Sequence, residues 1–290
     1  MGRAVLLFVA VGAAVRCDAL AARARHPSPA LDALEACVDA ALAPGRPIES
    51  LEAGERESVA VARRLRQRMD NFARNDDCRR CWLQRAHCVC DSTPALDARP
   101  SPPLSGFGRL FVVMHHKEVL LAVDTAKLLL AAYPDRTHLI VGGLGGQPAE
   151  AAMRASLERG TAAVLFPSED AVPAADVAAA GGAPLDVVVL DGTWSQARKL
   201  YHRLPAAGPR VKLDDETVGV LATGQGRQLR THPTKWREVS TLSAVRHLLG
   251  ALGVETVASL RDYQAVADAA ARRQLGPPRL RPGPPPGAPA

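Results

Sequence analysis

The chain has 290 residues and a mass of 30.7 kDa, enough for one full domain with extensions or for two small domains. Its content of 47% hydrophobic and 23% charged residues excludes a disordered chain or a coiled coil for the middle of the sequence. No apolar run reaches the roughly 18 residues of a spanning helix, which excludes a polytopic membrane protein, and we expect no stable membrane insertion of the mature chain. The net charge of +6 and the pI near 9.2 permit nucleic-acid binding without requiring it.

Residues 1–30 have the order of a targeting segment. Arg3 precedes an apolar stretch from Ala4 to Val15, and small residues follow, as in a signal peptide. The basic, acid-poor residues 23–26 are typical of a transit peptide. We therefore expect this segment to be removed, and the protein to act in an organelle, a plastid or mitochondrion, with the cytosol or nucleus as the alternative. The structural alternative is a buried N-terminal strand or helix.

Residues 31–77 are predicted to form a helical extension. Apolar residues between Leu31 and Ala41 recur at helical spacing, prolines interrupt the pattern, and a charged second helix runs from about Ser50 to Phe72. The arginine-rich run from Arg63 to Arg68 within it is more typical of a solvated helix face than of a binding surface.

Four of the six cysteines form a tight cluster of the type CxxC…CxC. Closely spaced cysteine pairs can supply the four thiolates of a tetrahedral zinc site, so we expect a structural zinc ion whose four positions are all filled by protein. His87 could replace one ligand. The alternative is a disulfide pair, if the leader directs the chain to an oxidising compartment. The four candidate ligands are Cys78, Cys81, Cys88 and Cys90.

From residue 109 onward, short apolar strands alternate with helices. This alternation predicts an α/β fold, a mainly parallel sheet covered by helices on both faces, with ligands bound beyond the carboxyl ends of the strands. The glycines at 142–146 match no nucleotide-binding fingerprint and predict a turn. The expected strands are 110–114, 138–141, 162–166 and 185–190, and the expected helices are 118–133, 149–159, 171–180, 197–204, 241–252 and 260–273.

The strand at 185–190 leads directly into Asp191-Gly192-Thr193-Trp194. Gly192 permits a sharp turn, and Thr193 or Ser195 can cap the helix that follows. That helix has an apolar back and a cationic front, which favours an anionic, polyphosphate substrate. An equally weighted alternative is that Asp191 only caps the helix and that the cations are solvated. The cations on this front are Arg198, Lys199, His202 and Arg203.

Two more polar segments, and a tail, complete the chain. His115 to Glu118 follow the first strand, where hydrogen-bonding roles are favoured over metal ligation by His115 and His116. Residues 224–233 are predicted to form a loop with donors such as Arg230, suited to a carboxylate or a phosphate. Residues 276–290 are rich in Pro and Gly and are predicted to be disordered.

In combination, these segments resemble the DTW-domain family, the tRNA-uridine aminocarboxypropyltransferases. The resemblance covers about Cys78 to Leu249, and the chain departs from the usual family pattern at His116, Asp124 and Ser243, where Pro, Asn and Glu are usual. The matching elements are the cysteine cluster, His115–Glu118 with Asp124-Thr-Ala-Lys-Leu, the block Asp191–Lys199 (DGTWSQARK), Leu229–Pro233 and Ser240–Ala244.

The resemblance implies a SPOUT-like domain at 78–275 with a C-terminal trefoil knot. It also implies transfer of the 3-amino-3-carboxypropyl group of S-adenosylmethionine to N3 of a uridine in tRNA, which releases 5′-methylthioadenosine. Asp191 is the candidate catalytic base or orienting acceptor, and Trp194 either stacks on a ring of a substrate or belongs to the core. The candidate donor-binding residues are Gly192, Thr193, Trp194, His115 and Glu118, and the candidate tRNA-binding residues are Arg198, Lys199, Arg203 and Arg230.

Two other functions are compatible with the same residues. One is a SPOUT-like RNA methyltransferase that uses the same donor. The other is a zinc-bearing RNA-binding module without catalysis. The sequence carries no prediction of the oligomeric state.

Overall fold

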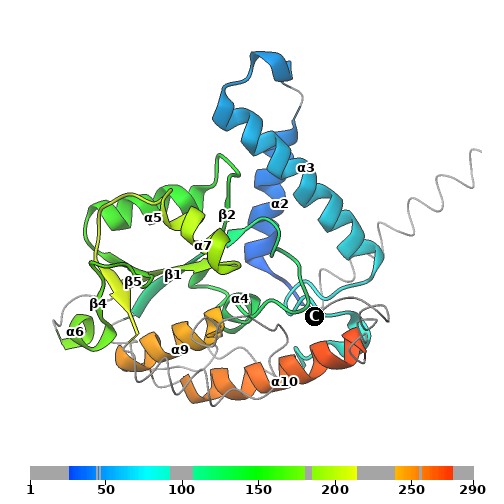
Figure 1. Ribbon diagram of the computed structural model, residues 1–290. Coiled ribbons are helices and arrows are strands. Elements are labelled where there is room, and N and C mark those ends of the chain that lie inside the picture. Colours follow the sequence, from blue (N-terminus) through cyan, green and yellow to red (C-terminus); the bar gives the residue numbers. More distant parts are fainter. Residues whose placement is uncertain are drawn as a thin grey trace, which may run out of the picture.

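A parallel six-stranded sheet forms the centre of the protein, and helices cover both of its faces (Figure 1). The computed structural model describes residues 26–43, 45, 47–91, 107–179, 185–213, 239–254 and 257–276. The strand order is β2-β1-β5-β3-β6-β4, and every neighbouring pair is parallel, which confirms the predicted α/β architecture. The strands are β1 (Phe107–His115), β2 (Thr137–Gly142), β3 (Ala162–Leu165), β4 (Val172–Pro173), β5 (Leu185–Asp191) and β6 (Arg210–Lys212).

The central strand β5 is almost entirely apolar because both of its faces are covered. It lies between β1 and β3, with Val189 opposite Val112 on one side and opposite Leu165 on the other. Alternation along the strand places Val187 and Val189 in one core cluster and Val188 in the other. Asp191 continues the first of these two series, so the pleat directs its side chain to the same face as Val189.

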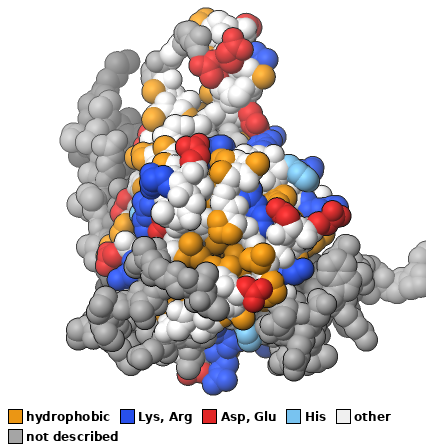
Figure 2. All heavy atoms as spheres, turned by 90° about the vertical axis from the view of Figure 1, so that its left-hand side faces the viewer, with side chains coloured by type: hydrophobic (Ala, Val, Ile, Leu, Met, Phe, Trp, Pro, Cys, Tyr) orange, Lys and Arg blue, Asp and Glu red, His pale blue; other side chains and the backbone are white. Residues whose placement is uncertain are grey.

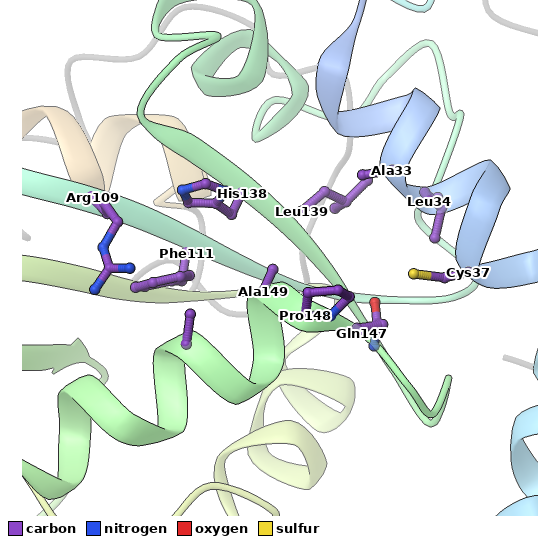
Figure 3. Close-up of a pocket in the computed structure, with 11 residues that line it drawn as sticks. Ala33, Leu34, Cys37, Arg109, Phe111, His138, Leu139, Gln147, Pro148 and Ala149 are labelled. Carbon is purple, nitrogen blue, oxygen red and sulfur yellow. The ribbon is translucent and has the colours of Figure 1, made fainter.

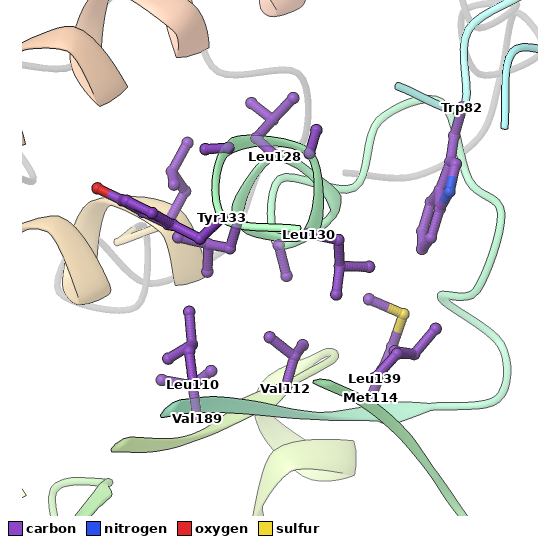
Figure 4. Close-up of a cluster of buried hydrophobic side chains, with 14 of the residues drawn as sticks. Trp82, Leu110, Val112, Met114, Leu128, Leu130, Tyr133, Leu139 and Val189 are labelled. Atoms are coloured by element: carbon purple, nitrogen blue, oxygen red, sulfur yellow. The ribbon is translucent and has the colours of Figure 1, made fainter. Parts of the chain in front are cut away.

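Different helices cover the two faces of the sheet. On one face, α5 (Pro148–Glu158) and α7 (Trp194–Tyr201) pack against the strands through side chains such as Leu157 and Leu200. On the other face lie α4 (Lys127–Ala132), α9 (Thr241–Ala251) and α10 (Val257–Leu275). Figure 4 shows the larger cluster on this second face, where residues of α4 pack over β1. Among the helices that the structure describes, none combines the length and apolarity needed to cross a membrane.

The N-terminal extension forms two helices, as predicted, joined through the short turn η1 (Ile48–Ser50). They are α2 (Pro29–Leu42), which packs on the edge strand β2, and α3 (Ala53–Arg74). The Ser28 side chain accepts a hydrogen bond from the backbone N–H of Leu31 and caps α2, so residues 28–30 belong to this helix although the expected leader included them. The rest of that leader up to residue 25, and residues 277–290 of the predicted tail, lie outside the described residues.

The predicted helix at 118–133 is wrong over most of its length. Residues 116–126 form turns, and only α4 at the end of this range is helical. Leu120 has a φ of 63°, which no α-helix accommodates. The Asp124 side chain then accepts a hydrogen bond from the backbone N–H of Lys127 at 3.0 Å and starts the helix there. The buried side chains of Glu118 and Asp124 thus belong to a folded loop and not to a helix face.

Two short strands were not predicted. β4 begins inside the helix expected at 171–180, of which α6 (Ala174–Ala179) remains, and β6 follows α7. Both strands are too short to show a hydrophobic period in the sequence, and each is defined by its pairing with a neighbouring strand in the sheet.

Figure 2 looks onto the molecule from the α6 side and shows hydrophobic side chains near the centre of that face. Val172 of β4, 41% exposed, is one of the few large hydrophobic residues on the surface of the part of the chain that the structure describes.

The predicted turn at 142–146 is present and is closed by the buried side chain of Gln147. Its Oε1 accepts a hydrogen bond from the Val141 N–H at 2.7 Å. Its Nε2 donates to the carbonyls of Val141 and Leu144 at 2.9 and 2.7 Å. A single amide therefore satisfies three buried backbone groups at the carboxyl end of β2.

We predict that Gln147→Ala lowers the free energy of unfolding by about 2–4 kcal/mol, because the three backbone groups lose their partner in a buried place. Chemical denaturation followed by circular dichroism measures the change. The matched control is Gln67→Ala on the exposed side of α3, expected to stay within about 0.5 kcal/mol of the parent. Equal stability of the two variants would contradict the structural role of Gln147.

Candidate functional site

The ends of β1 and β5 bring two predicted segments together. Met114 is paired with Asp191, so His115 and Gly192 follow side by side at the carboxyl edge of the sheet. Gly192 has a φ of 153°, and a Cβ there would lie 3.0 Å from the Gln196 Cβ and 3.3 Å from the His115 Cβ. Glycine is required at this position because the chain turns in close contact with His115. In open α/β sheets this edge is where ligands bind.

Asp191 is buried at this edge, with 4% of its surface exposed. Its Oδ1 accepts a hydrogen bond of 2.7 Å from the hydroxyl of Thr241, the first residue of α9. Its Oδ2 is buried and has no hydrogen-bond partner among the residues that the structure describes. Burial raises the pKa of Asp191 well above its usual range. The negative charge of Asp124, a hydrogen bond with the Asp124 side chain and, less strongly, the charge of Glu118 raise this pKa further. The predicted acid is thus an enclosed carboxyl group and not a simple helix cap.

A buried lysine compensates part of this negative charge. Lys127 is 2% exposed, and its ammonium group donates to the Ala122 carbonyl at 2.5 Å. Burial lowers the pKa of Lys127 to about 8, although the carboxylate of Asp124 opposes this shift. Sequence analysis named Asp124 only as part of a motif and missed Lys127 and Thr241 as site residues. The signal that could have found them is that all three lie in the two family motifs around 124–128 and 240–244.

The two histidines at the end of β1, His115 within the strand and His116 directly after it, are neutral hydrogen-bonding groups. The backbone N–H of Lys117 donates to the Nδ1 of His115 at 3.2 Å, so the neutral ring carries its proton on Nε2. Burial, followed by the charges of neighbouring groups, lowers the pKa of His116 to about 4. The two rings stack with centroids 4.3 Å apart. Among the described residues, the group of three or more potential metal ligands is the cysteine cluster, and the hydrogen-bonding role of the two histidines stays a prediction.

The helix after Asp191 has the predicted apolar back and cationic front. Thr193 caps α7 through a reciprocal pair of hydrogen bonds with Gln196, while Ala197 and Leu200 are buried. The cations Arg198, Lys199 and Arg203 are exposed, as is His202. The charges of Lys199 and Arg203 contribute to lowering the pKa of His115, after burial, which shows that they lie on the side of that histidine. The other candidate cation, Arg230, lies outside the described residues.

Trp194 is half-buried and belongs to an aromatic stack. Its ring lies nearly parallel to that of Phe166, with an interplanar angle of 13° and centroids 5.5 Å apart. Phe166 in turn stacks on Tyr201 at 4.3 Å. This stack packs on the face of the sheet that α5 and α7 cover. The Asp191 side chain points to the opposite face, the same face as Val187 and Val189 of β5. The packing role of Trp194 is therefore present, and contact with the donor stays a prediction.

The four clustered cysteines converge on one point. Their sulfur atoms all lie within 4.8 Å of one another, with Cys78 and Cys90 3.7 Å apart and Cys81 and Cys88 3.8 Å apart. Four thiolates at about 2.3 Å from a tetrahedral metal ion would be about 3.8 Å apart, so this donor set fits such an ion.

The cysteine segment also joins parts of the chain that are distant in sequence. Arg79 forms ion pairs with Glu35 and Asp32 of α2, at 2.6 and 2.7 Å. Arg80 donates to the Ala131 carbonyl of α4 at 2.8 Å. The Gln84 N–H, beside the short turn η2 (Arg85–His87), donates to the Gln274 side chain of α10 at 2.9 Å. The cysteine segment therefore connects the extension, the domain body and the last helix.

A separate cavity of about 310 Å³ lies between α2, β1, β2 and the start of α5 (Figure 3). Its polar lining includes Arg109, His138 and Gln147, and the rest is mainly apolar. Arg109 is held by the carboxylate of Asp186 at 2.7 Å. The cavity contains none of the predicted site residues, and its residues on β1 lie before the carboxyl end of that strand.

The fold and the site together define an α/β protein with a cluster of four cysteines that could hold a metal ion and a buried acid at the carboxyl edge of a parallel sheet. Residues 75–275 match the model of the DTW domain, and the chain belongs to the DTW domain family.

Three curated proteins named tRNA-uridine aminocarboxypropyltransferase 2 are similar to the chain. The Drosophila melanogaster protein is 28% identical over 181 residues, which cover 62% of this chain and 67% of that protein. The proteins of Macaca fascicularis and Mus musculus are each 24% identical over 132 and 137 residues, 45% and 47% of this chain. The chain spans less than half of these two proteins, 42% and 44% of their lengths. No solved structure matches the chain.

We predict that the protein holds about one metal ion per chain, and that Cys78→Ser removes it. Loss of the ion should abolish the cooperative unfolding transition or lower its midpoint by at least about 10 °C, because metal binding and folding are coupled. Elemental mass spectrometry and calorimetry measure the two effects. The matched control is Cys37→Ser on α2, outside the cluster, which should keep the metal. An intact mass with two disulfides and no metal would overturn the prediction.

We predict that Asp191→Asn raises the melting temperature at pH 7 by about 2–4 °C. A carboxyl group whose pKa is raised by folding stabilises the protein fully only below its unfolded pKa, and this stabilisation is lost as the pH rises through the folded pKa. The amide has no charge to bury, so the gain should shrink as the pH falls toward 4. Calorimetry between pH 4 and 8 measures it. A lower melting temperature at all pH values would show that Asp191 serves as scaffold.

Proposed function

We propose that this protein transfers the 3-amino-3-carboxypropyl group of S-adenosylmethionine to N3 of a uridine in tRNA and releases 5′-methylthioadenosine. The names of the three curated relatives and the family match support this activity. The observation that carries it in the structure is the Asp191 carboxyl group, which has a raised pKa and one buried oxygen without a partner among the described residues.

In the proposed reaction, a bond forms between N3 of the uracil and the terminal carbon of the propyl chain, and the bond from that carbon to sulfur breaks. The electron pair of the broken bond stays on sulfur, which leaves as a neutral thioether. The N3 proton is transferred to a base. A carboxylate of ordinary pKa is a weak base for this proton, whereas burial beside Asp124 and Glu118 makes the Asp191 carboxylate a stronger one.

Position must decide which carbon reacts, because the sulfonium activates three carbons at once. Holding the nucleophile in line with one carbon–sulfur bond can contribute about 7–11 kcal/mol. We assign the donor to the edge formed by Gly192, Thr193, Trp194, His115 and Glu118, and the uridine to the side of Asp191. A uridine in a loop or out of its stack is the expected substrate, because N3 is engaged in a base pair within a duplex.

The finer parts of the proposal concern the metal, the fold and the compartment. We propose zinc as the ion, because four thiolates are its common structural ligand set. We propose a SPOUT-like C-terminal trefoil knot, and residues 214–238, between β6 and α9, lie outside the described residues. The composition of residues 1–30 supports an organelle, a plastid or mitochondrion, as the place of action.

Two forms of labelled donor test the activity. With tRNA as acceptor, we predict that label from the carboxyl group of S-adenosylmethionine enters the nucleoside and that label from its methyl group does not. Asp191→Asn should lower kcat by at least about a hundredfold, the usual contribution of a positioned base. Nucleoside mass spectrometry identifies the product.

Each alternative function gives a different outcome in this experiment. Methyl label alone in the tRNA would establish an RNA methyltransferase and exclude the proposal. Unmodified tRNA, bound by the parent and by Asp191→Asn with the same affinity, would establish a non-catalytic RNA-binding module.

A further inference from the structure

Helix α3 lies outside the family domain and yet borders the candidate site. It ends at Arg74, and the match to the DTW domain begins at residue 75. The Ser58 hydroxyl accepts a hydrogen bond from Gly145 N–H at 2.8 Å, in the turn after β2. Arg68 donates to the Val119 carbonyl at 2.6 Å, in the loop after β1. The helix thus contacts loops at the carboxyl ends of two neighbouring strands.

A third contact links α3 to the cationic front of the site. Glu57 forms an ion pair of 2.8 Å with Arg203, which follows α7. Glu57, Val61, Arg64 and Arg68 recur every three or four residues and so form one face of the helix. Arg66, near the opposite face, pairs instead with Asp39 of α2. The arginine-rich run of α3 is therefore divided between two environments, and one of them is the rim of the site.

Arg64 is the exposed cation of the site-facing row. Its guanidinium donates to the Nε2 of His116 at 3.2 Å. His116 is neutral at physiological pH because its pKa is lowered to about 4, so this contact orients the guanidinium without neutralising it. Four of the five N–H donors of an arginine remain for other acceptors after one such bond.

Other cations gather around the same two histidines. The charges of Lys117, Arg64 and Arg68 lower the pKa of His116, and those of Lys199 and Arg203 lower the pKa of His115. Among the described residues, Arg64, Lys117 and Lys199 form no ion pair with a carboxylate. Like charges placed together without partners repel one another, and a bound polyanion removes this repulsion.

We propose that α3 forms one wall of the tRNA-binding surface and that Arg64, oriented by His116, donates to a phosphate of the tRNA backbone. This surface joins α3, the loop after β1 and the end of α7, and its exposed cations are Arg64, Lys117, Lys199 and Arg203. The inference rests on the proposed function, because it takes tRNA as the substrate. It replaces the interpretation of the whole Arg63–Arg68 run as a solvated helix face.

The test is tRNA binding by the full chain as a function of salt, measured by filter binding without the donor. Arg64→Gln should weaken binding about three- to tenfold at 0.1 M salt, and the slope of log K against log salt should fall by about one. Arg64→Lys should keep most of the slope because it keeps the charge. In the transfer assay, the KM for the donor should not change.

The matched control is Arg66→Gln, which removes the same charge from the other side of the helix and should leave affinity and slope within about twofold of the parent. Equal melting temperatures confirm that the variants are folded. If the parent transfers the group to tRNA but Arg64→Gln binds tRNA like Arg66→Gln, the inference is wrong and the proposed function stands. If Arg64→Gln weakens tRNA binding as expected but the parent transfers no group, the proposed function fails, and the inference that α3 belongs to the tRNA-binding surface stands. A parent protein without salt-dependent tRNA binding would overturn the inference.

Discussion

The burial of a single carboxyl group constrains most of this structure. Asp191 ends the central strand of a parallel sheet, on the face covered by α4 and α9, and the hydroxyl of Thr241 satisfies only one of its oxygens. Burying this group beside two more acids costs free energy, since burial and the charges of Asp124 and Glu118 raise the pKa of Asp191. The folded loop at 116–126, through Asp124 and Glu118, and the start of α9, through Thr241, are arranged around this group. Buried acidic groups with a raised pKa are typical of functional sites, where a reactive group is kept although it lowers the stability of the fold.

Charge around the site is organised by depth. The acids Glu118, Asp124 and Asp191 occupy buried positions behind the strand ends and two neutral histidines lie between. Cations are exposed at the rim, where Glu57 pairs with Arg203. Such a distribution suits a polyanionic substrate whose reacting base has to lose a proton, because the rim attracts phosphates and the interior strengthens a base. The neutrality of His115 and His116 is part of the arrangement: a charged ring there would compete with the rim for phosphate and would lower the pKa of the acids.

The cysteine segment connects elements that are distant in the sequence. It does so in a chain whose few aromatic residues provide little large apolar surface for packing. A short loop with four ligands and two arginines contacts α2, α4 and α10, whose contact residues span positions 32 to 274. A metal ion in this place would tie the N-terminal helices to the domain body, and so would hold α3 against the candidate site. The extension outside the family match is thereby part of the same folded unit.

The sequence by itself determined the alternation of apolar strands with helices, the strand that ends in Asp191, the four cysteines and the two N-terminal helices, because each depends on local period or spacing. Only the tertiary structure decided that residues 116–126 are turns, that β4 and β6 exist, that Trp194 stacks on Phe166, and that Asp124 and Thr241 lie at Asp191. Two-residue and three-residue strands carry no period, and a helical pattern gives way when buried carboxyl groups need backbone and hydroxyl partners. The environment of Arg64 was equally hidden, since a charged helix face has the same sequence whether it meets water or the edge of a site.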